Sequence, residues 1–325
     1  MKILYAANNN PGSRLQLSRF LMAANSNHNI KIAAYKISSP KNISIDWTLD
    51  CLLNIYKPEI LSLKNDNLNI YYDQIKSFAP DLIISDLEYF TSYIANVLNI
   101  RLWQYSSSLI NYALKDKYDL GLFKYYAHSL NINPVYNQRI VNIIDNSERN
   151  FVYSHYGDSL NPPILNSNFE WIRPYHKTYK SYILCKHNIT AALYGNNKNI
   201  LNTIKKHSDC VVFTESVLEN YPNIKIKNLD SQDEYYCNIK NSDIFICQGH
   251  SNFLADAFYN NKYSFIYPDY NSTESIINSQ LSQKMGYGKI MYDSKDIFNI
   301  PISEISFKYQ DNIKFIHEKI LELDG

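Results

Sequence analysis

Short apolar runs alternate with longer amphipathic stretches along the 325-residue chain. This alternation is typical of parallel strands joined by helices that cover the sheet. In the first half, strands are predicted over residues 2–6, 30–35, 81–85, 101–105 and 150–154. Helices are predicted over residues 14–24, 69–78 and 89–98. In the first of these helices the apolar residues recur at helical spacing and would face the sheet: Leu15, Leu17, Phe20, Leu21 and Ala24.

The same pattern starts again in the second half. Strands are predicted over residues 191–194, 210–214, 224–227, 243–247 and 264–267. Helices are predicted over residues 199–206, 233–241, 252–260, 273–285 and 310–323. The sequence therefore predicts an α/β protein with two Rossmann-like, doubly wound parallel-sheet domains that face each other across a cleft. The domains are expected to cover residues 1–175 and 176–325, with a connecting segment near residues 174–180.

Charge and composition narrow the class of protein. The chain has 32 basic and 31 acidic residues, a balance that argues against a surface built for duplex DNA or anionic lipid. Its five cysteines are scattered, without a CxxC pair, which favours a reducing compartment. The start of the sequence does not resemble a signal peptide, and no run of about 18 apolar residues suggests a membrane span. We therefore expect a cytoplasmic protein without an integral membrane segment.

Three of the eight glycines follow predicted strands: Gly12, Gly195 and Gly249. In doubly wound sheets ligands bind beyond the carboxyl ends of the strands, where loops lead into helices. Glycine turns at these positions can present backbone N–H groups to an anion. The alternative is that a strand-to-helix turn favours glycine for conformational reasons alone.

Residues 243–288 carry the most informative pattern. A buried strand ends at Cys247, and the turn Gln248–Asn252 leads into a helix. The start of that helix, with the side chains of Ser251 and Asn252, can donate hydrogen bonds to a diphosphate. Asp256 lies one helical turn further on, where its carboxylate can accept hydrogen bonds from two ribose hydroxyls. Glu274 and Asn278 are four residues apart on the next helix and can bind sugar hydroxyls from one face.

These residues resemble the nucleotide-sugar site of GT-B glycosyltransferases. Residues 247–256 read CQGHSNFLAD and align without a gap with the family's T-H-G-G-H-S-T-V-A-E pattern. Pro268 falls at the expected distance, and residues 274–278 (ESIIN) match the family's D/E-Q-x-x-N, with Ser275 in place of Gln. Residues 2–23, 78–106 and 191–200 are more loosely similar to other parts of the family. The enzymes that carry this pattern include the UDP-glycosyltransferases and the family 28-like N-acetylglucosaminyltransferase that makes lipid II.

The resemblance implies a donor site and the roles of its residues. Asp256 takes the place of the ribose-binding Glu, Gln248 that of a diphosphate-facing His, and His250 that of the second Gly. Because Gln248, His250 and Ser275 depart from the family pattern, the identity of the donor stays open. The donor-binding residues predicted in this way are Gly12, Ser13, Gly195, Asn196, Gln248, Gly249, His250, Ser251, Asn252, Asp256, Glu274 and Asn278.

An inverting enzyme of this kind needs a general base near the acceptor hydroxyl. Asp86 is the first candidate because it ends a predicted strand at the cleft; the alternative is that it only caps the following helix. His155, together with Asp158 three residues later, is the second candidate; the alternative for His155 is a solvated surface histidine. The sequence has no DxD motif and no His/Cys spacing typical of a metal site. We therefore expect neither a metal nor a cofactor besides the nucleotide-sugar.

The function predicted is a hexosyltransferase-type glycosyltransferase that is inverting, independent of metal, and uses a UDP-linked sugar. Two alternatives stay open: a UDP-sugar epimerase of the same fold, and a degenerate, non-catalytic module that binds a glycan or a partner. The acceptor is a hydroxyl compound of undefined class, namely a glycan, lipid, protein, metabolite or modified nucleobase. Residues 109–130 combine lysines with aromatics and can hold an acceptor or touch a membrane, although a solvated helix pair is the simpler interpretation. The sequence does not indicate an oligomeric state.

Overall fold

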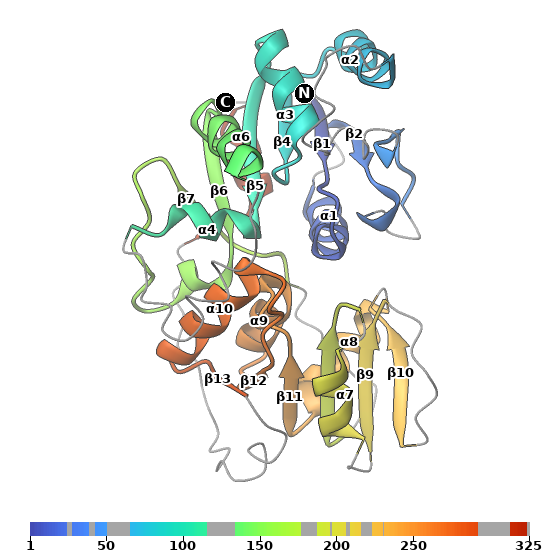
Figure 1. Cartoon of the computed structure of the whole chain (residues 1–325), viewed down its shortest axis with the longest axis vertical. Coiled ribbons are helices and arrows are strands. Elements are labelled where there is room, and N and C mark those ends of the chain that lie inside the picture. Colours follow the sequence, from blue (N-terminus) through green and yellow to red (C-terminus); the bar gives the residue numbers. More distant parts are fainter. Residues whose placement is uncertain are drawn as a thin grey trace.

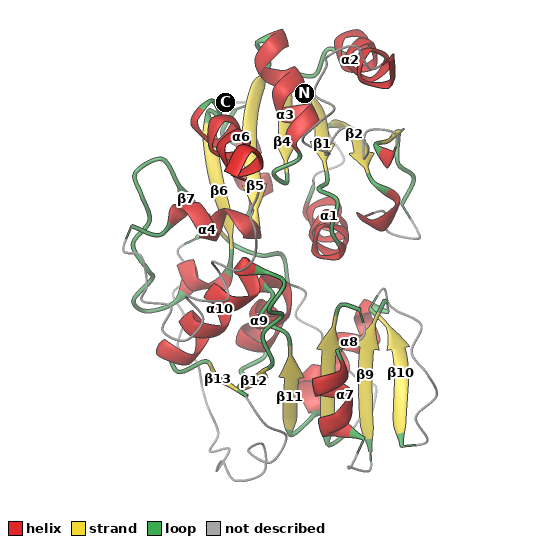
Figure 2. Ribbon diagram, viewed as in Figure 1, coloured by secondary structure: helices red, strands yellow, loops and turns green. Residues whose placement is uncertain are grey.

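The computed structural model describes residues 1–24, 28–38, 43–50, 66–115, 134–176, 187–195, 197–205, 209–215, 223–229, 231–291 and 313–323. The chain forms two α/β halves, drawn one above the other in Figures 1 and 2. Each half contains one parallel sheet with helices packed on it. The predicted fold class, two Rossmann-like domains, is confirmed. Residues 177–186 lie outside the described ranges, so the domain boundary near residue 175 stays a prediction.

The first sheet has seven strands in the order β3-β2-β1-β4-β5-β6-β7. Its strands are β1 Lys2–Ala6, β2 Asn29–Ala34, β3 Trp47–Thr48, β4 Leu82–Ser85, β5 Arg101–Ser106, β6 Arg149–Tyr153 and β7 Glu170–Ile172. All five strands predicted for this half are present, each within one residue at either end. The strands β3 and β7 were not predicted because two or three residues are too few to show a periodic pattern.

Helices cover both faces of the first sheet. They are α1 Pro11–Ala23, α2 Asp66–Phe78, α3 Tyr89–Leu98, α4 Ile110–Ala113 and α6 Pro134–Asp145, with short 3-10 helices η1 Lys36–Ser38, η3 Ser107–Leu109 and η4 His155–Asp158. Helix α1 begins at Pro11, whose missing N–H costs nothing there, and the Asn10 side chain accepts a hydrogen bond from the Ser13 N–H at 2.8 Å. On one face Phe20 of α1 packs with Ile3 and Tyr5 of β1.

The second sheet has six strands in the order β10-β9-β8-β11-β12-β13. Its strands are β8 Ile189–Leu193, β9 Cys210–Thr214, β10 Ile224–Asn228, β11 Ile244–Cys247, β12 Ser264–Ile266 and β13 Gly288–Ile290. Its helices are α7 Lys198–Ile204, α8 Gln232–Asn241, α9 Ser251–Tyr259 and α10 Thr273–Lys284. The five strands and four helices predicted here are present with shifts of at most two residues, and β13 was not predicted.

The last helix returns to the first half. Helix α11, Ile316–Leu321, places Ile316 and Ile320 in the same core cluster as Ile3, Tyr5 and Phe20. Figure 1 accordingly marks both chain ends on the upper half of the molecule. The helix predicted over 310–323 is therefore shorter in the described part, and it completes the core of the first sheet rather than that of the second.

The strand order reverses between β1 and β4 in the first sheet and between β8 and β11 in the second. At such a switch point the loops on either side run in opposite directions and leave a crevice beyond the carboxyl ends of the strands. In Figure 2 the strands of the two halves point toward one another. Both switch points therefore open onto the same space between the halves.

Apolar contacts fix the two halves against each other beside this space. Ile277 and Leu281 of α10 belong to one buried cluster with Leu109, Ile110 and other side chains of the first half. The Tyr156 hydroxyl donates to the backbone oxygen of Asn278 at 2.7 Å. The packing of α10 thus sets how the loops of the second half meet those of the first.

Candidate active site between the two halves

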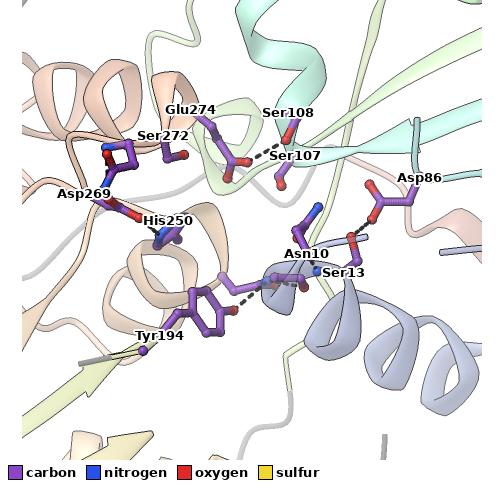
Figure 3. Close-up of a pocket in the computed structure, with 14 residues that line it drawn as sticks. Asn10, Ser13, Asp86, Ser107, Ser108, Tyr194, His250, Asp269, Ser272 and Glu274 are labelled. Atoms are coloured by element: carbon purple, nitrogen blue, oxygen red, sulfur yellow. Dashed lines mark hydrogen bonds and ion pairs between the residues drawn. The ribbon is translucent and has the colours of Figure 1, made fainter. Parts of the chain in front are cut away.

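A cavity of about 410 Å³ lies where the two switch points meet. The loops after β1, β4 and β5 supply its wall on the first half, and the loops after β8, β11 and β12 supply the other wall. Figure 3 shows these side chains around the cavity. Its described lining is Asn10, Gly12, Ser13, Asp86, Ser107, Ser108, Tyr194, Gly195, His250, Asn252, Asp269, Asn271, Ser272 and Glu274.

Three helices begin at this cavity. Helix α1 starts after its cap Asn10, α9 after His250, and α10 after its cap Ser272. The first N–H groups of a helix lack partners within the helix and carry partial positive charge, so they attract anions. Among the described lining residues there is no lysine or arginine. A bound diphosphate would therefore be held by backbone N–H groups, hydroxyls, amides and the His250 ring.

Asp86 is the buried carboxylate of the first wall. It follows β4, and its backbone N–H donates to the Ala6 oxygen at 2.9 Å, which fixes the loop. Its side chain accepts hydrogen bonds from the hydroxyls of Ser13 and Ser106. Burial raises the pKa of Asp86 to about 7, with a smaller contribution from Glu274, while the two hydroxyls oppose the rise. A carboxyl group that titrates near neutral pH is suited to act as a general base.

The capping role considered for Asp86 belongs to Glu88 instead. The Glu88 carboxylate accepts hydrogen bonds from the N–H groups of Phe90 at 3.1 Å and Thr91 at 2.7 Å, at the start of α3. Glu88, and not Asp86, therefore caps α3. The position of Asp86 at the cavity agrees with the prediction, and its catalytic role stays a prediction.

Glu274 and His250 form the opposite wall. The Ser108 hydroxyl donates to Glu274 at 2.8 Å across the two halves, and the Ser251 N–H donates to the other carboxylate oxygen at 3.3 Å. The His250 Nε2 lies 3.7 Å from the Asp269 carboxylate, and this contact lowers the pKa of Asp269. Asp269 was not predicted, although a polar residue directly after Pro268 at a strand end is a detectable signal.

Asp256, the predicted ribose ligand, has a different role. Both of its carboxylate oxygens lie 2.7 Å from Nη2 of Arg19 in the opposite half, and both side chains are almost fully buried. The same guanidinium donates to Asn252 at 3.1 Å and to the Tyr236 hydroxyl at 2.9 Å. Asp256 does not line the cavity and offers no accessible oxygen to a ribose. Burial by itself lowers the pKa of Arg19, but Asp256 raises it well above its usual value.

The rest of the predicted turn is divided between the cavity and the protein interior. Gln248 accepts from the Tyr194 N–H at 2.7 Å and donates to the Tyr194 oxygen at 3.3 Å, so it extends the end of β8. Gly249 packs against α10, where a Cβ atom would collide with Ser275 and Ser279. Neither residue lines this cavity, although Gln248 lines a second one that adjoins it. Their contact with a diphosphate stays a prediction.

Ser251 and Asn278 are also turned away from the cavity. The Asn278 amide donates to the Ser251 hydroxyl at 3.2 Å, and both side chains are buried between α9 and α10. Of this turn, His250 and Asn252 line the cavity, and their contact with a donor stays a prediction. Asn252 also donates to the Gly12 oxygen at 3.3 Å and so links the two walls.

His155, the second candidate base, is wrong. It is fully buried among the rings of Tyr156, Phe258 and Tyr287, and it does not line the cavity. Burial lowers the pKa of His155 to about 3, so the ring is neutral at physiological pH. The surface position considered as its alternative is also wrong, because the chain after β6 turns under α9 and covers the ring.

The other predicted residues divide as follows. Gly12, Ser13 and Gly195 line the cavity, and Gly195 has φ = 68°, a left-handed conformation that favours glycine. Asn196 lies outside the described residues. A second cavity of about 410 Å³ adjoins the first and shares Tyr194, Asp269 and Asn271 with it. Together the two cavities give room for a ligand larger than a single sugar.

Two further observations concern only the described ranges. Within them no helix combines the length and hydropathy that crossing a bilayer requires. No three His, Cys, Asp or Glu side chains in those ranges come together as metal ligands. The predicted independence from metal is not tested by this and stays a prediction.

Comparison with known proteins shows which solved structures share this fold. No protein-family model matches the sequence, and no curated protein matches it. The spinosyn forosaminyltransferase SpnP superposes with a TM-score of 0.56 over 91% of this chain and 88% of its own, at 13% identity. The rhamnosyltransferase SpnG gives 0.55 over 90% and 86%, at 10% identity, and the calicheamicin glycosyltransferase CalG4 gives 0.54 over 89% and 85%, at 10%. One SpnG structure contains thymidine diphosphate and another the spinosyn aglycone. The predicted resemblance to GT-B enzymes is thus confirmed for the fold.

Proposed function

We propose that this protein is a glycosyltransferase that moves a sugar from a nucleotide-sugar donor to an acceptor hydroxyl. The observation that carries the proposal is the cavity at the two switch points of a GT-B fold. There the starts of α1, α9 and α10 meet the Asp86 carboxyl, whose pKa is about 7. One side of the cavity suits a diphosphate and the other suits a hydroxyl that must lose its proton. The sequence resemblance adds that the donor is UDP-linked.

The proposed reaction is a direct displacement with inversion. The Asp86 carboxylate takes the proton from the acceptor hydroxyl as its oxygen bonds to the anomeric carbon of the donor. The bond from that carbon to the diphosphate breaks, and the negative charge grows on the leaving oxygen. Backbone N–H groups at the start of α9, with His250 and Asn252, stabilise that charge. In this scheme no metal ion is needed.

Asp256 has no donor-binding role in this proposal, because Arg19 occupies both of its oxygens. This occupancy favours one rival function, a GT-B module that binds a glycan or a partner without turnover. The two functions differ in donor binding. A glycosyltransferase must bind a nucleotide-sugar and split it, whereas the module need not.

The experiment is to incubate the purified chain with UDP-sugars and dTDP-sugars and to measure release of nucleoside diphosphate, with calorimetry for binding. We expect binding and slow hydrolysis with at least one UDP-sugar. The variant Asp86→Asn should bind the donor and lose turnover, while Asp145→Asn, an exposed residue at the end of α6, serves as the matched control. If no nucleotide or nucleotide-sugar binds, the proposal fails and the non-catalytic module is favoured.

A further inference from the structure

The wall of the cavity on the first half is polar throughout its described part. It consists of Asn10, Gly12, Ser13, Asp86, Ser107 and Ser108, with no aliphatic or aromatic side chain among them. Cavities that bind apolar small molecules are lined mainly by hydrophobic and aromatic side chains. This wall faces the acceptor in the reaction proposed above. An apolar aglycone would lose its contact with water here without gaining apolar contacts in return.

Charge excludes a second class of acceptor. Three carboxylates line the cavity, Asp86, Asp269 and Glu274, whereas its described lining contains no lysine or arginine. His250 already contacts Asp269, and the nearby Arg19 is bound to Asp256. In the reaction proposed above the donor diphosphate takes up the N–H groups at the start of α9. A further phosphate or carboxylate on the acceptor would meet these carboxylates and the diphosphate itself in a partly buried space, where like charges repel strongly. The acceptor that fits is therefore neutral.

The hydrogen-bonding groups of the cavity are suited to bind the hydroxyl groups of a ligand. Two carboxylates of the cavity already accept hydrogen bonds from serine hydroxyls, Asp86 from Ser13 and Glu274 from Ser108. An ionised carboxylate offers about four acceptor positions, and Glu274 uses two of them in the described contacts, at 2.8 Å and 3.3 Å. Free positions thus remain for the hydroxyls of a ligand. Figure 3 shows Asp86 and Glu274 on the two walls, with Ser107 and Ser108 between them.

We propose that the acceptor is a neutral carbohydrate. One of its hydroxyls reaches Asp86, and neighbouring hydroxyls bind Ser107, Ser108 and Glu274. Vicinal hydroxyls fit this arrangement because each is both a donor and an acceptor, as the mixed wall of carboxylates, hydroxyls and amides requires. This inference rests on the proposed glycosyltransferase function and adds the substrate class to it.

The test compares three acceptor classes with the full chain and the UDP-sugar that it hydrolyses fastest. The panel contains methyl glycosides and disaccharides of common hexoses, phenolic or macrolide aglycones, and hexose phosphates. We expect the neutral sugars to raise UDP release at least tenfold above hydrolysis and to yield a glycosylated product in mass spectrometry. Aglycones and hexose phosphates should leave the rate near the level of hydrolysis.

The outcomes separate the two proposals. If aglycones or hexose phosphates accelerate UDP release more than the neutral sugars do, or if no neutral sugar accelerates it, the carbohydrate inference is wrong while the transferase proposal stands. If no donor is bound or split at all, the transferase proposal itself fails.

A variant of Ser108 tests whether the acceptor binds to the cavity wall of the first half. Ser108→Ala removes one hydroxyl beside Glu274, and we expect the KM for the sugar acceptor to rise by about three- to tenfold, the usual effect of one lost hydrogen bond. Its effect on kcat should be smaller. Asn202→Ala, an exposed residue on α7, is the control. An unchanged KM in the Ser108 variant would place the acceptor elsewhere.

Discussion

Asp86 and Asp256 are both buried carboxylates near the space between the halves, yet their partners differ. Asp256 lies against the Arg19 guanidinium, which supplies a full positive charge and two short hydrogen bonds. In the described part of the chain Asp86 accepts from the hydroxyls of Ser13 and Ser106 and from a backbone N–H, and it lines the cavity. Burial raises the pKa of both groups. The Arg19 cation opposes the rise in Asp256, whereas serine hydroxyls and a backbone N–H oppose it in Asp86.

This difference is the one expected between a structural carboxylate, Asp256, and the base that we propose, Asp86. A buried carboxylate paired with a buried cation joins two parts of a protein, and removing either partner leaves an uncompensated buried charge. A buried carboxyl without a cation, open to a cavity, can gain and lose a proton under physiological conditions. Burial alone therefore does not distinguish the proposed base from a structural carboxylate, whereas burial together with the type of partner does.

The largest effect is expected for Asp86→Asn. This variant keeps the shape and the hydroxyl partners but removes the proton acceptor, so turnover should fall about 10²- to 10⁴-fold. Steady-state release of nucleoside diphosphate measures it. Circular dichroism should show an intact fold. Residual activity within threefold of the original chain would mean that another group is the base.

The second-largest effect is expected for the stability of an Arg19 variant. Arg19→Met leaves the Asp256 carboxylate buried without a cation, which costs about 3–5 kcal/mol and lowers the melting temperature on the order of 10 °C. The double variant Arg19→Met/Asp256→Leu should recover most of this loss, because an apolar pair can replace a buried ion pair. Differential scanning calorimetry measures both. Equal melting temperatures for the single variant and the original chain would show that the contact contributes nothing.

The pH dependence follows from the pKa of Asp86. The base must be ionised, so turnover should rise with pH through about 7.

The same pKa predicts how stability changes with pH. The pKa of Asp86 in the folded chain lies above the ordinary value of 3.8, so the neutral carboxyl is the form that folding favours. Stability contributed by this group is complete below about pH 4 and is lost as the pH rises toward 7. Asp86→Asn should therefore gain melting temperature relative to the original chain between pH 5 and pH 8, and a constant difference would contradict the raised pKa.

The smallest effect is expected for Ser13→Ala. The Ser13 hydroxyl stabilises the ionised form of Asp86, so its loss should raise the pKa further and move the rising limb of the pH profile upward. Turnover at pH 6.5 should fall by a few-fold, about the effect of one hydrogen bond. Ser18→Ala on the same helix is the matched control. A limb that moves to lower pH would show that Ser13 does not act on Asp86.

The fold was largely predictable from the sequence because parallel strands are buried on both faces. Runs such as LIIS at 82–85, CVVFT at 210–214 and IFIC at 244–247 are apolar almost throughout and are easily recognised. Helix α6 was not predicted, although its buried Ile140, Ile143 and Ile144 follow helical spacing. The signal was present there, whereas β3, β7 and β13 were too short to give one.

The site was predictable only in part, and the reason is physical. The place of several predicted residues in the cavity lining follows from the topology, because they lie in segments that follow strands: Gly12, Ser13, Asp86, Gly195, His250, Asn252 and Glu274. The partner of Asp256 was not predictable, because Arg19 reaches it only when the two halves dock. His155 failed for the same reason, since its burial depends on α9 from the other half. Local patterns place a residue at an edge of the sheet, but not against a segment distant in sequence.

The return of α11 to the first sheet affects how the halves can move. The chain leaves the first half after β7 and enters it again at α11, so the second half is covalently joined at two points rather than at one. The two covalent connections together define one axis of rotation between the halves. Opening about that axis remains free of covalent resistance, while twisting of one half against the other is restrained. Any widening of the cavity for entry or exit of ligands is thereby directed along a single path.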